Sequence, residues 1–305
     1  MAVVFAYLLV VLIWTTTPLA IVWSGETDWF FGVASRTALG ALLILPLLWW
    51  KRAKSPRFQF DIESLKIYLL AGLPIFGGIT LMYWSGQHLP SGWIAILFAM
   101  TPIMTGILAH YLLPNSRLSL QKFVAIAISL FGLWILFAPN LQTDLAAIQI
   151  TAIFIALSSV FCHSLGSVLL KRCGTRLPSI HVAVGALWVS VLVHFMLGPT
   201  TLLEWPELGV RESYAILYAA SVGSVIGFAL YFYLVRHVDA MKVALIPVIT
   251  PVFALLIGHF LNGEQLTLTI WLGAAIVISG LVLFEWRFKS RLFRVLTYGK
   301  VKREE

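Results

Sequence analysis

Arg36 is the only basic residue that lies well inside an apolar stretch of this 305-residue chain. It follows Trp29 by seven positions, which is roughly 10 Å along a helix that rises about 1.5 Å per residue. A guanidinium in an apolar setting needs backbone carbonyls, loop carboxylates such as Glu26 or Asp28, or an anionic group of a ligand. Arg36 therefore predicts either a fixed structural bridge or a contact to a ligand carboxylate.

His163 lies in the inner half of another apolar stretch. A histidine there can hydrogen-bond a ligand or carry a proton near neutral pH, and a packing role fits equally well. The adjacent Ser164 does not indicate a serine protease, because neighbouring residues on a helix point in different directions. The histidines near the ends of apolar stretches are expected at the membrane interface: His88, His110, His194, His237 and His259.

Several small polar residues, glycines and aromatics inside apolar stretches are further candidates for a binding site. Threonine hydroxyls can instead bond their own helix carbonyls, glycines can simply allow close packing, and aromatics can pack in the core or against lipid. The candidates are Trp14, Thr15, Thr16, Thr101 and Thr250, the glycines Gly78 and Gly227, and an apolar cage of Tyr83, Trp84, Phe98, Phe228 and Tyr231.

Pro102 and Pro251 each interrupt an apolar stretch near its centre. A proline removes an intrahelical hydrogen bond and leaves a carbonyl free. A simple kink explains either residue, and their matching positions also suit a pair of hinges.

Motifs for metal, redox or nucleotide chemistry are missing from the sequence. Cys162 and Cys173 form neither a disulfide framework nor a zinc or iron–sulfur pattern. There is no Gly-x-x-x-x-Gly-Lys-Ser/Thr loop for ATP. We expect no cofactor, no metal and no enzymatic activity. A membrane-embedded lipid-modifying enzyme is a rival interpretation, but it would need clustered Asp, His or Arg residues at an interface.

The elements that position these residues are long apolar segments. In the whole chain, 60% of the residues are hydrophobic and only 11% are charged. An ordinary soluble protein carries roughly 25% charged residues, so a soluble globular enzyme is excluded. A membrane helix needs about 20 apolar residues. The pattern predicts an all-α integral membrane protein with ten spans near 2–23, 29–50, 65–87, 91–112, 121–139, 146–170, 179–198, 213–235, 241–261 and 270–286.

The basic residues divide unevenly between the two sides of such a bundle. Of the 21 Lys and Arg residues, all except Arg36 and Arg211 fall on the side of the C-terminus. Basic residues stay in the cytoplasm during insertion, so both termini are expected to be cytoplasmic, in a bacterial inner membrane. The same rule explains the net charge of +8 without a nucleic-acid partner.

An internal repeat joins the two halves of the chain. Aligning Thr101-Pro102 with Thr250-Pro251 brings Gly78 onto Gly227 and His110 onto His259 without a gap. We therefore expect five-helix repeats at 2–139 and 146–286, followed by a basic tail at 287–305. Because five is odd, the second repeat must cross the membrane in the opposite sense. Inverted repeats of this kind are typical of transporters that work by alternating access.

The chain resembles EamA-type carriers of the drug/metabolite transporter superfamily. The resemblance rests on the Trp14 region, Arg36, Thr101-Pro102, Gly280 and the run from Asn262 to Thr267. One departure is that the Gly263-Glu264 pair of the second repeat reads Pro114-Asn115-Ser116 in the first. If this glutamate tethers loop to helix in the family, only one half of the chain keeps the tether.

The resemblance implies a secondary transporter that exports amino acids, amino-acid derivatives or other small metabolites from a central cavity. Multidrug efflux of lipophilic compounds is the alternative. No carboxylate lies deeper in the runs than Glu285, so facilitated diffusion is favoured over proton exchange, for which His163 is the candidate. The residues leave open the cargo, the direction of transport and whether two chains form a homodimer.

Overall fold

The structure is a computed structural model that describes residues 2–51, 58–114, 116, 118–139, 146–174, 177–203, 205–227, 230, 234 and 246–285. Within these ranges the regular elements are helices, and no strand occurs. The α-helices are α1 (Ala2–Trp23), α2 (Trp29–Leu43), α3 (Leu45–Lys51), α4 (Ile62–Leu73), α5 (Thr80–Gly86), α6 (Ser91–Phe98), α7 (Thr101–Leu112), α8 (Leu120–Phe137), α9 (Ala146–Cys173), α10 (Ser179–Leu197), α11 (Pro199–Leu203), α12 (Val210–Tyr218), α15 (Ile246–Asn262) and α16 (Leu268–Glu285). Two further segments, η2 (Pro74–Ile79) and η4 (Ala219–Ile226), are π-helical.

Seven helical segments of the described chain are long and apolar enough to cross a membrane. They are Val3–Trp23, Ile62–Gly86, Ser91–Leu112, Leu120–Phe137, Ala147–Cys173, Ser179–Leu197 and Leu268–Glu285. Two shorter apolar helices are Trp29–Leu43 and Ile246–Asn262. The chain is therefore a multi-span helical membrane protein, and the count of ten spans stays a prediction.

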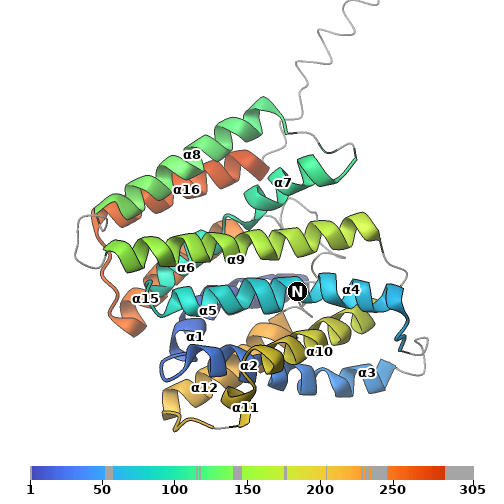
Figure 1. The fold of residues 1–305 in the computed structure, drawn as a ribbon. Helices are drawn as coiled ribbons and strands as arrows, with labels where there is room; N and C mark the ends of the chain where they lie inside the picture. The colour runs from blue at the N-terminus through green and yellow to red at the C-terminus, as the bar shows by residue number, and fades with distance from the viewer. Residues whose placement is uncertain are drawn as a thin grey trace, which may run out of the picture.

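Helix α8 shows how these helices meet lipid on one side and protein on the other. Phe123, Phe131 and Trp134 are exposed, whereas Ser129 and Gly132 are buried. Large apolar side chains on an exposed helix face are costly in water and favourable in a bilayer. The buried face of α8 packs against α16 (Figure 1).

Small residues allow α8 and α16 to approach closely. A Cβ atom on Gly280 would lie 2.8 Å from the carbonyl oxygen of Ala125 and 2.9 Å from the backbone nitrogen of Ser129. A Cβ atom on Gly132 would lie 2.6 Å from the backbone nitrogen of Val277. Close backbone contact of this kind is a common way to join membrane helices.

Helix α9 runs across the middle of the molecule, between the continuous α4–η2–α5 segment and the α8–α16 pair (Figure 1). It contacts η2, α5, α6 and α7. On another side, α1 packs against α15, α6 and η4, and α2 packs against α10 and η4. These contacts place α2, α1, α5 and η4 next to one another around Arg36.

Two of the expected spans are interrupted near prolines. The run 29–50 divides at Ile44 into α2 and α3, and Pro46 is the second residue of α3. The run 91–112 divides at Ala99 and Met100 into α6 and α7, and Pro102 lies in the first turn of α7. Proline lacks the backbone N–H that an uninterrupted helix would need, and it is well tolerated in a first turn.

The π-helical segments lie within the expected spans 65–87 and 213–235. In the first, Pro74 opens η2 and cannot donate a hydrogen bond to the preceding turn. Segment η4 contains no proline. A π-helical turn leaves carbonyls that side chains can bond, and such turns often occur at functional sites.

Candidate functional site

Arg36 lies in the middle of α2 with an exposed fraction of only 4%. Its Nε and Nη2 groups each donate a hydrogen bond of 3.3 Å to the hydroxyl oxygen of Ser224 in η4. Its Nη1 group is buried and has no hydrogen-bond partner among the described residues. The guanidinium therefore has donor capacity left inside the helix bundle.

Local interactions hold both partners in place. The Asp28 carboxylate accepts hydrogen bonds from the backbone N–H groups of Phe30 and Phe31, at 2.8 and 3.1 Å, and so begins α2. The Ser224 hydroxyl donates to the carbonyl oxygen of Ala219 at 2.9 Å, within the π-helical segment. This bond uses the hydroxyl proton and leaves the oxygen free to accept from Arg36.

Tyr83 of α5 and Gly223 of η4 complete the surroundings of the guanidinium. The Cζ atom of Arg36 lies 5.9 Å from the centre of the Tyr83 ring, a cation–π distance. Tyr83 is fully buried and its hydroxyl accepts a hydrogen bond of 2.9 Å from Ser24. A Cβ atom on Gly223 would lie 3.7 Å from both Arg36 Nη2 and Thr17 Oγ1, so the missing side chain leaves space between those groups.

The loop carboxylates considered as partners of Arg36 are engaged elsewhere. Glu26 forms an ion pair with Arg211, and Asp28 caps α2. Glu212, which is buried near the start of α12, accepts hydrogen bonds from the backbone N–H and the hydroxyl of Thr27, at 3.1 and 2.5 Å. A fixed bridge from Arg36 to Glu26 or Asp28 is therefore wrong, because Glu26 pairs with Arg211 and Asp28 caps α2.

The threonines of α1 behave differently from one another. The Thr16 hydroxyl contacts the Tyr218 hydroxyl of α12 at 2.5 Å and also bonds the carbonyl of Ile13 at 3.0 Å. Thr15 is buried, and its hydroxyl has no partner among the described residues. Thr16 thus joins α1 to α12, next to the Arg36 group, while Thr15 contributes an unsatisfied hydroxyl to the interior.

Trp14 lies where α1 meets the end of η4. A Cβ atom on Gly227 would lie 3.5 Å from Trp14 Nε1 and 3.2 Å from a methyl group of Ile13. Gly227 therefore permits α1 to pack against this span. Trp14, Thr16, Gly227 and Arg36 lie on neighbouring elements, as Figure 1 shows for α1, α2 and α12.

His163 forms the centre of a second group on η2, α6, α7 and α9. Its ring lies edge-on to the Phe98 ring, with centroids 5.1 Å apart. A Cβ atom on Gly78 would lie 3.3 Å from the Cβ atom of His163. The neighbouring Ser164 donates to the carbonyl of Thr101 at 3.4 Å. The Nδ1 atom of His163 is buried and unpaired within the described chain.

The remaining predicted residues lie apart from these two groups or outside the described residues. Thr250 and Pro251 are buried within α15, which is continuous through the proline. Pro102, by contrast, lies in the first turn of α7, directly after the break between α6 and α7. Phe228 and Tyr231 lie outside the described residues.

Sequence reasoning missed two residues that the structure brings into hydrogen bonds with predicted site residues. Ser224 and Tyr218 were not singled out, although polar residues in an apolar run near Gly223 and Gly227 were a usable signal. His194 lies in the last turn of α10, near the end of its span, where its side chain is buried against the protein and its Nε2 atom lies 2.8 Å from the Thr80 hydroxyl.

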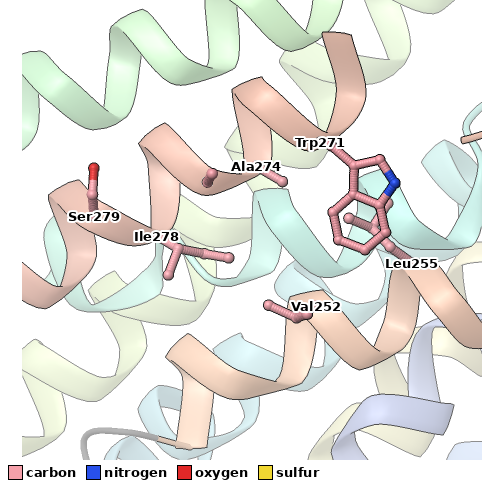
Figure 2. Close-up of a pocket in the computed structure, with 7 residues that line it drawn as sticks. Val252, Leu255, Trp271, Ala274, Ile278 and Ser279 are labelled. Carbon is pink, nitrogen blue, oxygen red and sulfur yellow. The ribbon is translucent and has the colours of Figure 1, made fainter. Parts of the chain in front are cut away.

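A pocket of about 330 Å³ lies away from both groups, between α15 and α16 (Figure 2). It is lined by Val252, Leu255, Trp271, Ala274, Ala275, Ile278 and Ser279. The Ser279 hydroxyl bonds the carbonyl of Ile276 at 2.7 Å, so the lining offers a ligand little polar contact. In the described part of the chain, no three His, Cys, Asp or Glu side chains gather into a metal site.

Within the described residues, the bundle holds a buried cation without a counter-ion. This is typical of membrane transport proteins, because intramembrane charges are expensive and usually mark a solute path. The chain belongs to the EamA-like transporter family, whose model matches residues 1–138 and again 150–286. It is thus a membrane transporter of that family.

Individual relatives agree with this assignment. The chain is 24% identical to the uncharacterized transporter YoaV of Bacillus subtilis, over 84% of this chain and 87% of that protein. It is 27% identical to the uncharacterized inner membrane transporter YedA of Escherichia coli, over 81% and 78%. It is 22% identical to a probable amino-acid metabolite efflux pump of Salmonella typhimurium, over 74% and 79%.

A protein of known crystal structure shares the fold. The two structures align with a TM-score of 0.62 at 15% identity, over 93% of this chain and 97% of the other. This similarity concerns the arrangement of the helices alone.

Proposed function

We propose that this chain is a secondary transporter that exports amino acids or amino-acid derivatives across the inner membrane by alternating access. The observation that carries the proposal is the buried Arg36, whose Nη1 group has no partner among the described residues. A cargo carboxylate would supply that partner, and charge-assisted hydrogen bonds are among the strong ones. The Salmonella relative is named for the efflux of amino-acid metabolites, which favours the same cargo class.

The proposed cargo site combines the two groups around Arg36 and His163. The Arg36 group would hold the carboxylate, and the apolar surfaces of Tyr83 and Phe98 would cover the rest of the cargo. The full set of proposed contacts is Trp14, Thr15, Thr16, Arg36, Gly78, Tyr83, Phe98, Thr101, His163, Gly227, Phe228, Tyr231 and Thr250.

Two inverted five-helix repeats, at 2–139 and 146–286, would supply the alternating motion, with both termini in the cytoplasm. Matching local geometry supports the repeats. The π-helical segments Pro74–Ile79 and Ala219–Ile226 fall in spans that the alignment of Gly78 with Gly227 makes equivalent. In addition, His110 donates from Nδ1 to the carbonyl of Ser116 at 3.0 Å, and His259 does so to that of Glu264 at 2.7 Å.

The hinges of this motion would lie at Pro102 and Pro251. Pro102 follows the break between α6 and α7, and Pro251 interrupts the hydrogen bonding of α15 from within. A broken helix and a proline-weakened helix both bend more readily than a regular one.

Counterflow in proteoliposomes tests the proposed function. Vesicles holding the full chain and loaded with unlabelled leucine or N-acetylleucine should take up the labelled compound faster than protein-free vesicles. The variant Arg36→Gln should lower uptake roughly 10- to 100-fold, as expected for the loss of a charged hydrogen bond of about 1.5–3 kcal/mol.

Arg211→Gln is the matched control, because Arg211 pairs with Glu26 on the exposed surface. This variant should transport as the native chain does. The proposal is contradicted if no amino acid or derivative exchanges while lipophilic drugs do, which would point to multidrug efflux. If Arg36→Gln reduces the transport of carboxylates and of their amide analogues equally, Arg36 has a structural role.

A further inference from the structure

The charges around Arg36 indicate which charged form of the cargo binds there. The guanidinium is buried, and its contacts are a neutral hydroxyl, that of Ser224, and a neutral ring, that of Tyr83. Within the described residues, the recorded ion pair is Arg211 with Glu26 and does not involve Arg36. Among the described residues, the interior therefore holds one positive charge that no carboxylate balances.

The carboxylates that lie at or contact the loop before α2 are already engaged. Asp28 caps α2, Glu26 pairs with Arg211 and Glu212 binds Thr27 through both oxygens. A free amino acid brings a carboxylate and an ammonium group together. Its carboxylate would meet Arg36, but its ammonium would find no unengaged carboxylate among these residues and would add a second cation near the first.

A carboxylate without an ammonium group avoids this cost. It brings one negative charge to one positive charge, and the occupied site becomes neutral. Desolvating an ion in the membrane interior is favourable only when a counter-ion balances it. The unengaged donor Nη1 suits a single anionic group, and the missing side chain of Gly223 leaves space beside the neighbouring Nη2.

We propose that the transported form of the cargo is an anion, a carboxylate whose amine is acylated or absent, and that the membrane potential drives it outward. This inference rests on the proposed transport function. Arg36 stays with the protein while the cargo crosses, so each cycle moves one negative charge. A cell interior is electrically negative, and each 100 mV corresponds to about 2.3 kcal/mol per charge, or about a 50-fold outward gradient.

This mechanism gives export a direction and an energy source without a coupling ion. No proton needs to bind at His163, and no carboxylate exchange site is required. The potential alone favours release outside, because the negatively charged cytoplasm repels the anion.

Four leucine compounds of different charge test the inference in proteoliposomes that contain the full chain. N-acetylleucine is an anion, leucine is a zwitterion, N-acetylleucinamide is neutral and leucinamide is a cation. A tenfold inward K⁺ gradient with valinomycin makes the vesicle interior positive. A monovalent anion at equilibrium with that potential accumulates tenfold inside, whereas a species of no net charge does not accumulate.

We expect N-acetylleucine to accumulate up to about tenfold, to be lost when the gradient is reversed, and to be carried faster than leucine. Arg36→Gln should abolish this accumulation. Arg36→Lys keeps the positive charge, so its N-acetylleucine transport should again depend on the membrane potential, with weaker binding of the cargo. If Arg36→Gln does not fold, Ser224→Ala keeps the charge and should raise the Michaelis constant for N-acetylleucine without altering the accumulation ratio.

If leucine is carried as fast as N-acetylleucine, or if N-acetylleucine transport does not depend on the membrane potential, the inference is wrong but the proposed function still holds. If none of the four compounds is carried, the result contradicts both the inference and the proposed function. Accumulation driven by an imposed pH step in place of the potential would also overturn the inference.

Discussion

Arg36 is the residue on which the proposed cargo binding depends. A buried guanidinium without an ion partner costs several kcal/mol of desolvation, which the two bonds to Ser224 and the ring of Tyr83 offset only in part. Charged residues inside a membrane protein are usually functional, because their desolvation is so unfavourable. The precise placement of Arg36 should therefore matter for cargo binding more than for stability.

Replacing Ser224 tests this placement. Ser224→Ala removes the single oxygen that accepts both hydrogen bonds of Arg36. A net loss of about 1 kcal/mol should raise the Michaelis constant for N-acetylleucine roughly fivefold. Ser221→Ala is the control, because the Ser221 hydroxyl bonds the carbonyl of Leu217, four residues back in the adjoining α12, and does not contact Arg36. Equal effects of the two variants on transport would argue against a role for Ser224.

His163 gives a second prediction at this scale. Its ring packs against Phe98, and we expect it to line the site without carrying a proton. Counterflow by His163→Gln should then proceed without a pH gradient, and a protonophore should change it little, as in the native chain. Accumulation driven by a pH step in the native chain and lost in His163→Gln would show that His163 couples transport to protons.

At the scale of elements, Glu264 joins the loop after α15 to the start of α6. Its carboxylate accepts hydrogen bonds from the backbone N–H groups of Ser91 and Gly92, at 2.8 and 3.1 Å. These are donors that a helix start leaves unpaired, and a negative charge there also favours the helix dipole. Gly263, with a φ of 65°, makes the turn that brings Glu264 into position.

Glu264→Gln should therefore destabilise the protein by about 1–2 kcal/mol, since it removes the charge and one acceptor from the start of α6. Thermal unfolding in detergent measures the effect. Glu207→Gln, at an exposed position, should leave the melting temperature unchanged. If the two variants melt alike, the contact of Glu264 with α6 contributes little.

The prolines give a further prediction about helix motion. Pro251→Ala should restore a hydrogen-bond donor within α15, stiffen this helix and reduce transport while protein levels hold. Pro102→Ala should have a smaller effect, because Pro102 lies in a first turn where its missing N–H costs little. Full transport by the double variant would show that neither proline acts as a hinge and that both serve only in packing.

For the whole molecule, the uneven distribution of basic residues predicts the orientation. Ser116→Cys, in a background without Cys162 and Cys173, should resist an impermeant thiol reagent added outside intact cells, as the exposed native Cys173 should. Glu207→Cys should react. Labelling of Ser116→Cys from outside, with Glu207→Cys protected, would reverse the orientation.

The sequence by itself determined the membrane class, the family resemblance and most spans. The runs 2–23, 121–139 and 179–198 agree closely with Val3–Trp23, Leu120–Phe137 and Ser179–Leu197. The reason is physical: about 20 consecutive apolar residues must bury their backbone polar groups within themselves, which makes each such run a helix regardless of its neighbours.

Only the tertiary structure decided which side chains meet. Arg36 and Ser224 are 188 residues apart, and their contact depends on how α2 and η4 are rotated and packed, which no local pattern records. The same holds for Glu264 and Ser91, and for His194 and Thr80. Local chemistry would have given Arg36 a nearby carboxylate, Glu26 or Asp28, but Arg211 and the start of α2 bind those carboxylates. Packing settles which partners meet, so the lack of a counter-ion for Arg36 among the described residues emerges only in the folded chain.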